Sequence, residues 1–208
     1  MRVPLLLPLL QLLVISLPFI SIDATQLVYD SHGKELSSDS IYYVLPANGG
    51  TGGGFIAIPS ELRCLHFVSQ ERNESLIGTP VVFTPLNPSL GPAIRMSSDV
   101  FIEFSDLDSF CVDRLDWHLT SMLPESFLEQ HKHVAAGNED GVRSFGVFRV
   151  EKHDTNVMGY KLMSCVDKGL CQDLGLLADK GKTWLTISNK PFMVVFKEAC
   201  FPHKVCPP

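Results

Sequence analysis

The chain has 208 residues, a formal net charge of −6 at pH 7 and a calculated pI near 5.6. Its length suits a single domain behind a short leader. The acidic balance excludes nucleic acid as the expected partner, because phosphate binding needs a basic surface.

Residues 1–24 predict a secretory signal peptide, which leaves a mature domain at 25–208. Arg2 precedes an apolar run that extends to Ile22, and Ala24 supplies the small residue of a cleavage site. A retained membrane anchor is the alternative, but the prolines within the run and the small-residue exit favour cleavage. No second apolar stretch of spanning length follows, so we expect no membrane partner. The expected destination is the extracellular space (apoplast), with the vacuole as the alternative.

The rest of the chain is dominated by short strand signals. Runs rich in β-branched and aromatic residues are bounded by Gly, Pro, Asn, Asp or Ser. In chain order they are 41–45, 55–58, 80–83, 100–104, 145–150, 160–163, 183–187 and 191–196. Only 125–133 is expected to form a helical turn or two. Many short strands separated by turn clusters predict an all-β barrel or sandwich.

One usable N-glycosylation sequon is present. Asn73 is followed by Glu74 and Ser75, whereas the similar triplet at Asn87 has proline in the forbidden middle position. In a secreted chain we therefore expect Asn73 to be exposed and glycosylated.

The chain contains an even number of cysteines, which favours a disulfide framework in a secreted protein. They are Cys64, Cys111, Cys165, Cys171, Cys200 and Cys206. Six cysteines allow fifteen connectivities, so the sequence does not decide the pairing. Short spacings favour Cys165–Cys171 and Cys200–Cys206, which leaves Cys64–Cys111. A zinc site is the competing interpretation, but no CxxC pair is present.

The patterns of common enzymes and metal sites are missing from the sequence. There is no GxSxG, HExxH or Gly-rich phosphate loop. The histidines around His131 and His133 lack nearby carboxylates or thiolates at metal-ligand spacing, and no EF-hand spacing occurs. We therefore expect neither catalysis nor a cofactor or metal.

The segment after the leader, VYDSHGKELSSDSIYYVL, carries a specific signature. The signature consists of aliphatic residues, an Asp, a Gly-containing turn and a Tyr at fixed spacing. In this chain these positions are Val28, Asp30, Gly33, Leu36, Tyr42 and Val44. This resembles the opening of the plant Kunitz-type (soybean trypsin inhibitor-like, legume and miraculin-like) family. Further similar segments lie at 78–88, 95–104, 159–165, 171–177 and 185–196. The resemblance covers essentially all of the mature chain.

The resemblance implies a β-trefoil of twelve strands in three similar units, stapled by disulfides and monomeric. It favours the pairings Cys64–Cys111 and Cys165–Cys171, while Cys200–Cys206 follows only from the two cysteines left over. It also implies a secreted serine protease inhibitor, which inserts a rigid loop into the protease active site as a substrate would. The protease could be chymotrypsin-, trypsin-, subtilisin- or carboxypeptidase-like.

By resemblance the inhibitory loop spans 83–90, with Pro85, Leu86, Asn87 and Pro88 at its centre. We expect Leu86 rather than Asn87 to enter the primary pocket, because Asn87 would place proline just after the attacked bond. No Arg or Lys occurs from 81 to 94, so a trypsin-like target is not favoured. The family's loop-supporting asparagine aligns with about Ser38, so its side-chain hydrogen bonds are not expected.

A second candidate loop lies between Cys165 and Cys171, where Lys168 and Gly169 stand near the apex. Lys168 suits a trypsin-like pocket, and ring closure limits the loop's conformations. The different-class alternative for the whole chain is a non-inhibitory trefoil that serves as a storage or carbohydrate-binding defence protein. The absence of repeated Gln-x-Trp motifs lowers the sugar-binding option.

Overall fold

The computed structural model describes residues 26–47, 51–60, 64–105, 107, 114–124, 131–139, 141–152, 159–166 and 169–199. The predicted signal peptide, Lys168 and three cysteines (Cys111, Cys200 and Cys206) lie outside these residues. Within the described ranges, no helix has the length and apolarity needed to cross a membrane.

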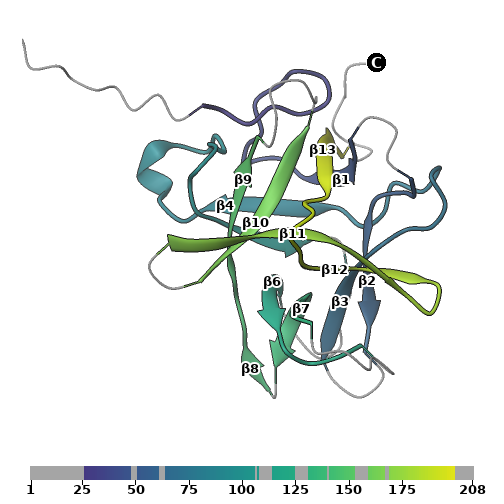
Figure 1. Cartoon of the computed structure of the whole chain (residues 1–208). Coiled ribbons are helices and arrows are strands. Elements are labelled where there is room, and N and C mark those ends of the chain that lie inside the picture. The colour runs from purple at the N-terminus through teal and green to yellow at the C-terminus, as the bar shows by residue number, and fades with distance from the viewer. Residues whose placement is uncertain are drawn as a thin grey trace, which may run out of the picture.

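Thirteen strands and one 3₁₀ helix form the described structure (Figure 1). The strands of the first half are β1 (Tyr42–Pro46), β2 (Phe55–Pro59), β3 (Leu65–Gln70), β4 (Val81–Pro85), β5 (Val100–Phe104) and β6 (Leu115–Thr120). Those of the second half are β7 (His133–Glu139), β8 (Val142–Arg143), β9 (Val147–Glu151), β10 (Tyr160–Val166), β11 (Leu170–Asp179), β12 (Lys182–Ile187) and β13 (Met193–Glu198). The helix η1 (Pro88–Leu90) lies between β4 and β5.

Six strands close into a barrel. The strand β1 pairs with β4, β4 with β5, β5 with β9, β9 with β10, β10 with β13, and β13 returns to β1, all antiparallel. Closure leaves this layer without an unpaired edge strand. In Figure 1, β1, β4, β9, β10 and β13 occupy the upper part of the molecule, and β2, β3, β6 and β7 lie below them.

Three hairpins cover one end of the barrel. They are β2–β3, β6–β7 and β11–β12, and the strands β3, β7 and β12 pair with one another in a triangle. A six-stranded barrel capped by three hairpins is a β-trefoil, which confirms the predicted fold class. These are the twelve expected strands, and β8 is a thirteenth because it extends the β7 hairpin by only two residue pairs.

The hydrophobic core fills the barrel and the inner face of the cap. Trp117 is fully buried and contacts Phe55, Phe104 and Phe148, with ring centroids 5.2–6.2 Å apart. Each barrel strand contributes alternate residues, as in β5, where Val100, Ile102 and Phe104 point inward. Fully burying a side chain of this size stabilises the fold by roughly 1.5–3 kcal/mol.

Five strands were missing from the sequence-based prediction: β3, β6, β7, β8 and β11. All except β8 belong to the cap, where polar residues such as Ser69, His118 and Thr120 are buried and interrupt the apolar alternation. Strand β7 contains two alanines and a glycine, which carry weak strand signals. The described end of the predicted helical segment, 131–133, is not helical, because His133 begins β7.

The segment before β1 runs along the chain between β4 and β5. Val28 donates its N–H to the Ile94 carbonyl at 3.0 Å, and Ile94 donates to Leu36 at 2.8 Å. Val28, Leu36 and Ile94 are fully buried, so this contact belongs to the core. The N-terminal segment thereby fixes one limb of the loop described next.

Candidate inhibitory loop

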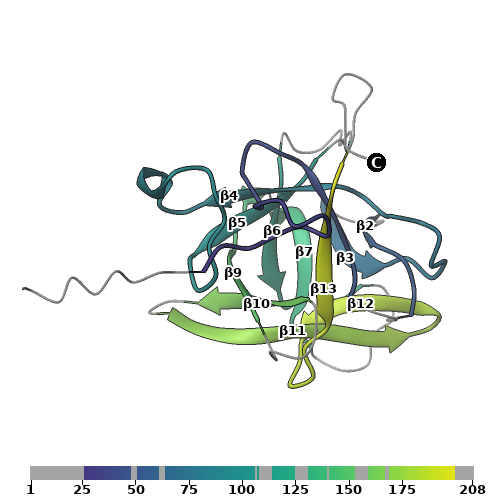
Figure 2. The same cartoon turned by 90° about the horizontal axis from the view of Figure 1, so that it is seen from above.

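The connection between β4 and β5 projects from the barrel (Figures 1 and 2). Its base is the last pair of the β4–β5 ladder, Pro85 opposite Val100. One further hydrogen bond follows, from the Leu86 N–H to the Asp99 carbonyl at 2.9 Å. The backbone of Leu86 is therefore held by the hairpin, and the free loop begins after it.

The tip of the loop is closed by its own local hydrogen bonds. Asn87 is extended, at φ −109° and ψ 91°, and its Oδ1 accepts the Ser89 N–H at 3.2 Å. The turn η1 follows and ends at Gly91, whose N–H donates to Pro88 at 3.1 Å and whose φ of 86° favours glycine. The extended backbone stops at Asn87, because this side chain caps a helical turn.

The side chains of the loop are presented to solvent. Thr84 and all residues from 86 to 90 are exposed, with 47% of Leu86 and 54% of Leu90 accessible. Leu90 is a further exposed apolar residue of the loop that no sequence pattern singles out. Its exposure depends on the helical turn η1. The signals for this turn are the two prolines and the capping Asn87, and they are not interpreted as a helical turn in the sequence.

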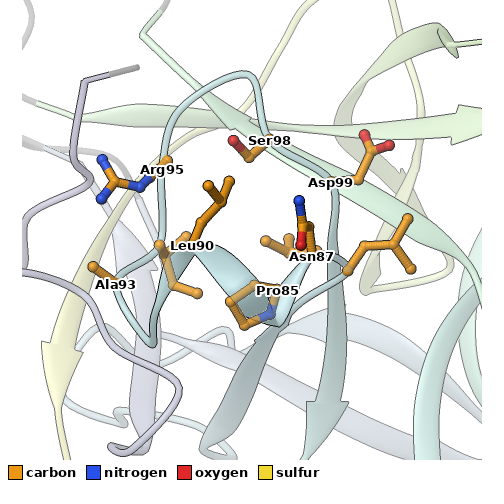
Figure 3. A pocket seen from close by; sticks show the side chains of 10 residues that line it. Pro85, Asn87, Leu90, Ala93, Arg95, Ser98 and Asp99 are labelled. Carbon is orange, nitrogen blue, oxygen red and sulfur yellow. The ribbon is translucent and has the colours of Figure 1, made fainter. Parts of the chain in front are cut away.

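A shallow pocket of about 150 Å³ lies between the loop and the ends of β4 and β5. Its lining residues are Pro85, Leu86, Asn87, Leu90, Ala93, Ile94, Arg95, Ser98, Asp99 and Val100. Figure 3 shows Arg95 at one side of the pocket and Asp99 at the other, with Leu90 and Asn87 between them. The loop is thus supported at its base and has open space beneath its tip.

Ser38 contacts the second limb of the loop through its backbone. Its N–H donates to the Pro92 carbonyl at 2.9 Å, and the adjacent Ser37 forms a bridge with Ala93. Ser38 therefore contacts the limb after η1 and not the limb that carries Leu86.

The second candidate loop is the turn of the β10–β11 hairpin. Cys165 and Cys171 are directly opposite each other in the ladder and form the predicted disulfide. Gly169 has a φ of 77°, and Leu170 is 70% exposed beside the turn. Lys168 lies outside the described residues.

The pairing of Cys64 with Cys111 remains a prediction, because Cys64 is disulfide-bonded but Cys111 is not described. The proposed Cys200–Cys206 bond also lies outside the described part.

The remaining sequence-predicted sites are placed as follows. Asn73 is exposed, and its Oδ1 accepts the Ser75 N–H at 3.0 Å in the turn after β3. Among the described residues, no group of three or more His, Cys, Asp or Glu side chains has a geometry that would hold a metal ion.

The trefoil with an exposed hairpin loop is the architecture of a known inhibitor family. The family model described as "Trypsin and protease inhibitor", of the Kunitz legume type, matches residues 28–198. The chain belongs to this Kunitz family of trypsin and protease inhibitors.

Several relatives cover nearly the same length. An α-amylase/subtilisin inhibitor from Oryza sativa subsp. japonica is 41% identical over 203 residues, which is 95% of this chain and 96% of the relative. An endogenous α-amylase/subtilisin inhibitor from Triticum aestivum is 40% identical over 181 residues, which is 83% of this chain and 96% of the relative. A solved structure of the rice bifunctional inhibitor has a TM-score of 0.67 at 41% identity, covering 85% of this chain and all of that one. Soybean trypsin inhibitor also has a TM-score of 0.67, at 27% identity, covering 84% and 100%.

Proposed function

We propose that this chain inhibits a subtilisin-like serine protease, with Leu86 as the side chain that enters the primary pocket. The observation that carries the proposal is that Leu86 has a restrained backbone and an exposed side chain. Its N–H is tied to Asp99, its side chain is half exposed, and the next residue is extended. A bound protease would meet a segment that is already ordered, so little conformational entropy is lost on docking.

The chemistry of the loop favours an apolar pocket over an acidic one. A trypsin-like enzyme selects a cation with an aspartate at the base of its pocket, and residues 81–94 contain no Arg or Lys. The relatives at 40–41% identity are named for subtilisin, which agrees with this choice. The inhibitor needs no catalytic group of its own, because the protease supplies the nucleophile. A tethered leaving group favours resealing of the bond.

The names of the same relatives favour a second activity, binding of an α-amylase. If a single face carried both activities, the two enzymes would compete for the inhibitor. A ternary complex of chain, subtilisin and amylase in gel filtration would show two separate faces. Failure of amylase to bind at all would remove this second function and leave the first unaffected.

The main proposal is tested with the mature protein against subtilisin, chymotrypsin, elastase, trypsin and a serine carboxypeptidase. We expect inhibition of subtilisin and weak or no inhibition of trypsin. Leu86→Asp should raise the inhibition constant for subtilisin by about 30-fold or more, the size of an interface hot spot. Leu90→Asp is the matched control, because it introduces the same charge in the same loop. Inhibition of no protease at micromolar concentration would refute the proposal, and loss of inhibition only in Leu90→Asp would reassign the contact residue.

Lys168 provides the alternative contact. If trypsin is the enzyme inhibited, Lys168→Ala should abolish that inhibition and Leu86→Asp should not. Trypsin inhibition that survives Lys168→Ala would eliminate the disulfide hairpin as the reactive site.

We further propose that the chain is secreted and carries a glycan at Asn73. The disulfides at Cys64 and Cys165–Cys171 support an oxidising compartment, and the exposed turn at Asn73 leaves the amide accessible. Expression in plant cells with a C-terminal tag would show the tag in the apoplastic fluid and a mass that falls in Asn73→Gln. An intracellular, unglycosylated product would contradict both statements.

A further inference from the structure

A charged pair supports the limb of the loop that carries Leu86. Arg149, on β9, places its Nε 2.5 Å from Oδ1 of Asp99. Both side chains are about one-third exposed or less, at 27% and 33%. Asp99 is the same residue whose carbonyl accepts the Leu86 N–H at 2.9 Å. Asp99 therefore links the two residues: its carboxylate accepts from the Arg149 guanidinium, and its backbone carbonyl accepts from Leu86.

Arg149 is itself held in a defined place. Its neighbours Phe148 and Val150 are fully buried, and Phe148 pairs with Val100, the residue after Asp99. On the other side, Nη2 lies 3.8 Å from where a Cβ on Gly169 would stand. The guanidinium thus lies between Asp99 and the turn of the β10–β11 hairpin. In both Figure 1 and Figure 2 the start of β11 and η1 lie on the same side of the molecule.

We infer that Arg149 is a positioning residue for the loop. By binding the Asp99 side chain it restrains the Asp99 backbone, and so it holds the Leu86 amide in the conformation that a protease would meet. Ser38 does not serve this limb, because its backbone N–H contacts Pro92 on the opposite limb. The inference rests on the proposed function for its consequence in inhibition, but the restraint of Leu86 is measurable without any protease.

The expected size of the effect follows from the exposure of the pair. A partly exposed ion pair contributes modestly, so its loss should change the opening equilibrium of the Leu86 hydrogen bond by about two- to fivefold. The inhibition constant should rise by a similar factor, because a looser loop must be ordered on docking. Slow cleavage of the Leu86–Asn87 bond during long incubation should become faster, because the two ends of the cleaved bond separate more easily before resealing when Leu86 is less restrained.

The test uses Arg149→Met, which keeps the length of the side chain and removes the charge. The matched control is Arg114→Met, because Arg114 pairs with Glu103 at the other end of β5, away from the loop. The measurements are amide hydrogen exchange of Leu86 by NMR, the inhibition constant for subtilisin, and the melting temperature. Asp99→Asn and the double variant complete a thermodynamic cycle, and Arg149→Lys tests whether a cation alone restores the restraint.

We expect faster Leu86 exchange and weaker inhibition in Arg149→Met and Asp99→Asn, with little further change in the double variant. Arg149→Lys should recover part of both, and Arg114→Met should change neither. Unchanged Leu86 exchange in Arg149→Met would overturn the inference, whatever happens to inhibition. Faster exchange in a protein that inhibits no protease would leave the restraint established and refute the proposed function instead.

Discussion

The imidazole of His133 packs edge-on against the ring of Phe67, with centroids 6.2 Å apart and an interplanar angle of 90°. His133 is fully buried where β7 meets β12 in the cap, opposite Thr186. Burial, with a smaller effect from His131, lowers the pKa of His133 to about 4. The charged form of this side chain is therefore strongly disfavoured in the folded protein.

The first prediction concerns stability at acidic pH. An unfolded histidine has a pKa near 6.5, so the contribution of His133 is fully present above that value and is lost as the pH falls toward 4. We expect a loss of stability on the order of 2–3 kcal/mol between pH 7 and pH 4 from this residue. Denaturant unfolding of His133→Gln should show a shallower pH dependence in this window. His32→Gln, in an exposed turn, is the control and should keep the slope of the unaltered protein. Equal slopes for all three proteins would contradict the assignment.

The second prediction concerns Trp117 at the centre of the core. Its side chain is fully buried, and its Nε1–H finds no hydrogen-bond partner within the described part of the chain. Trp117→Ala should cost about 3–5 kcal/mol through lost packing and the cavity left behind. Trp117→Phe should cost clearly less, because both variants remove the unpaired N–H but Phe keeps a ring that fills most of the space. Thermal and urea unfolding would measure both, and equal costs would contradict the expectation that ring volume decides the difference.

A third prediction concerns Glu198, which links the two ends of the described chain. Its carboxylate is buried and accepts from Lys34 Nζ at 3.0 and 3.1 Å and from Ser40 Oγ at 2.7 Å. Glu198→Ala should destabilise the fold by about 1.5–3 kcal/mol, as expected for hydrogen bonds to a charged group. Lys34→Met should cost less, because the lysine side chain is half exposed and is already solvated. The reverse order in urea unfolding would refute this account.

The fourth prediction separates the two candidate loops. Replacing Cys165 and Cys171 with alanine opens a ring with a sequence separation of 6 and should cost about 2 kcal/mol in stability. If Leu86 is the contact residue, subtilisin inhibition by the folded variant should remain close to that of the unaltered protein. If the hairpin is the reactive site, inhibition should disappear together with the disulfide. Inhibition assays at a temperature where the variant is folded decide between them.

The sequence was sufficient for the family, for the all-β class and for the loop between β4 and β5. The all-β class rests on local patterns, namely alternating strands and turn residues. The family and the loop rest on the resemblance, which the spaced signature from Val28 to Val44 and the segment 78–88 carry. The Cys165–Cys171 bond was also predictable, because the two residues lie close in sequence. Features of this kind depend on residues that are close in sequence, so they can be predicted without the tertiary structure.

Only the tertiary structure showed what supports Leu86. Arg149 and Asp99 come from different strands, and they meet because β9 pairs with β5 in the closed barrel. Four of the six cap strands escaped prediction for a related reason, since buried polar residues interrupt their apolar pattern. Ser69 on β3, for example, donates its hydroxyl to the Thr183 carbonyl of another hairpin. Neighbouring residues in the sequence do not indicate which distant strand will pair with a given strand. Closure of the barrel determines these pairings, and the pairings determine which side chains support the loop.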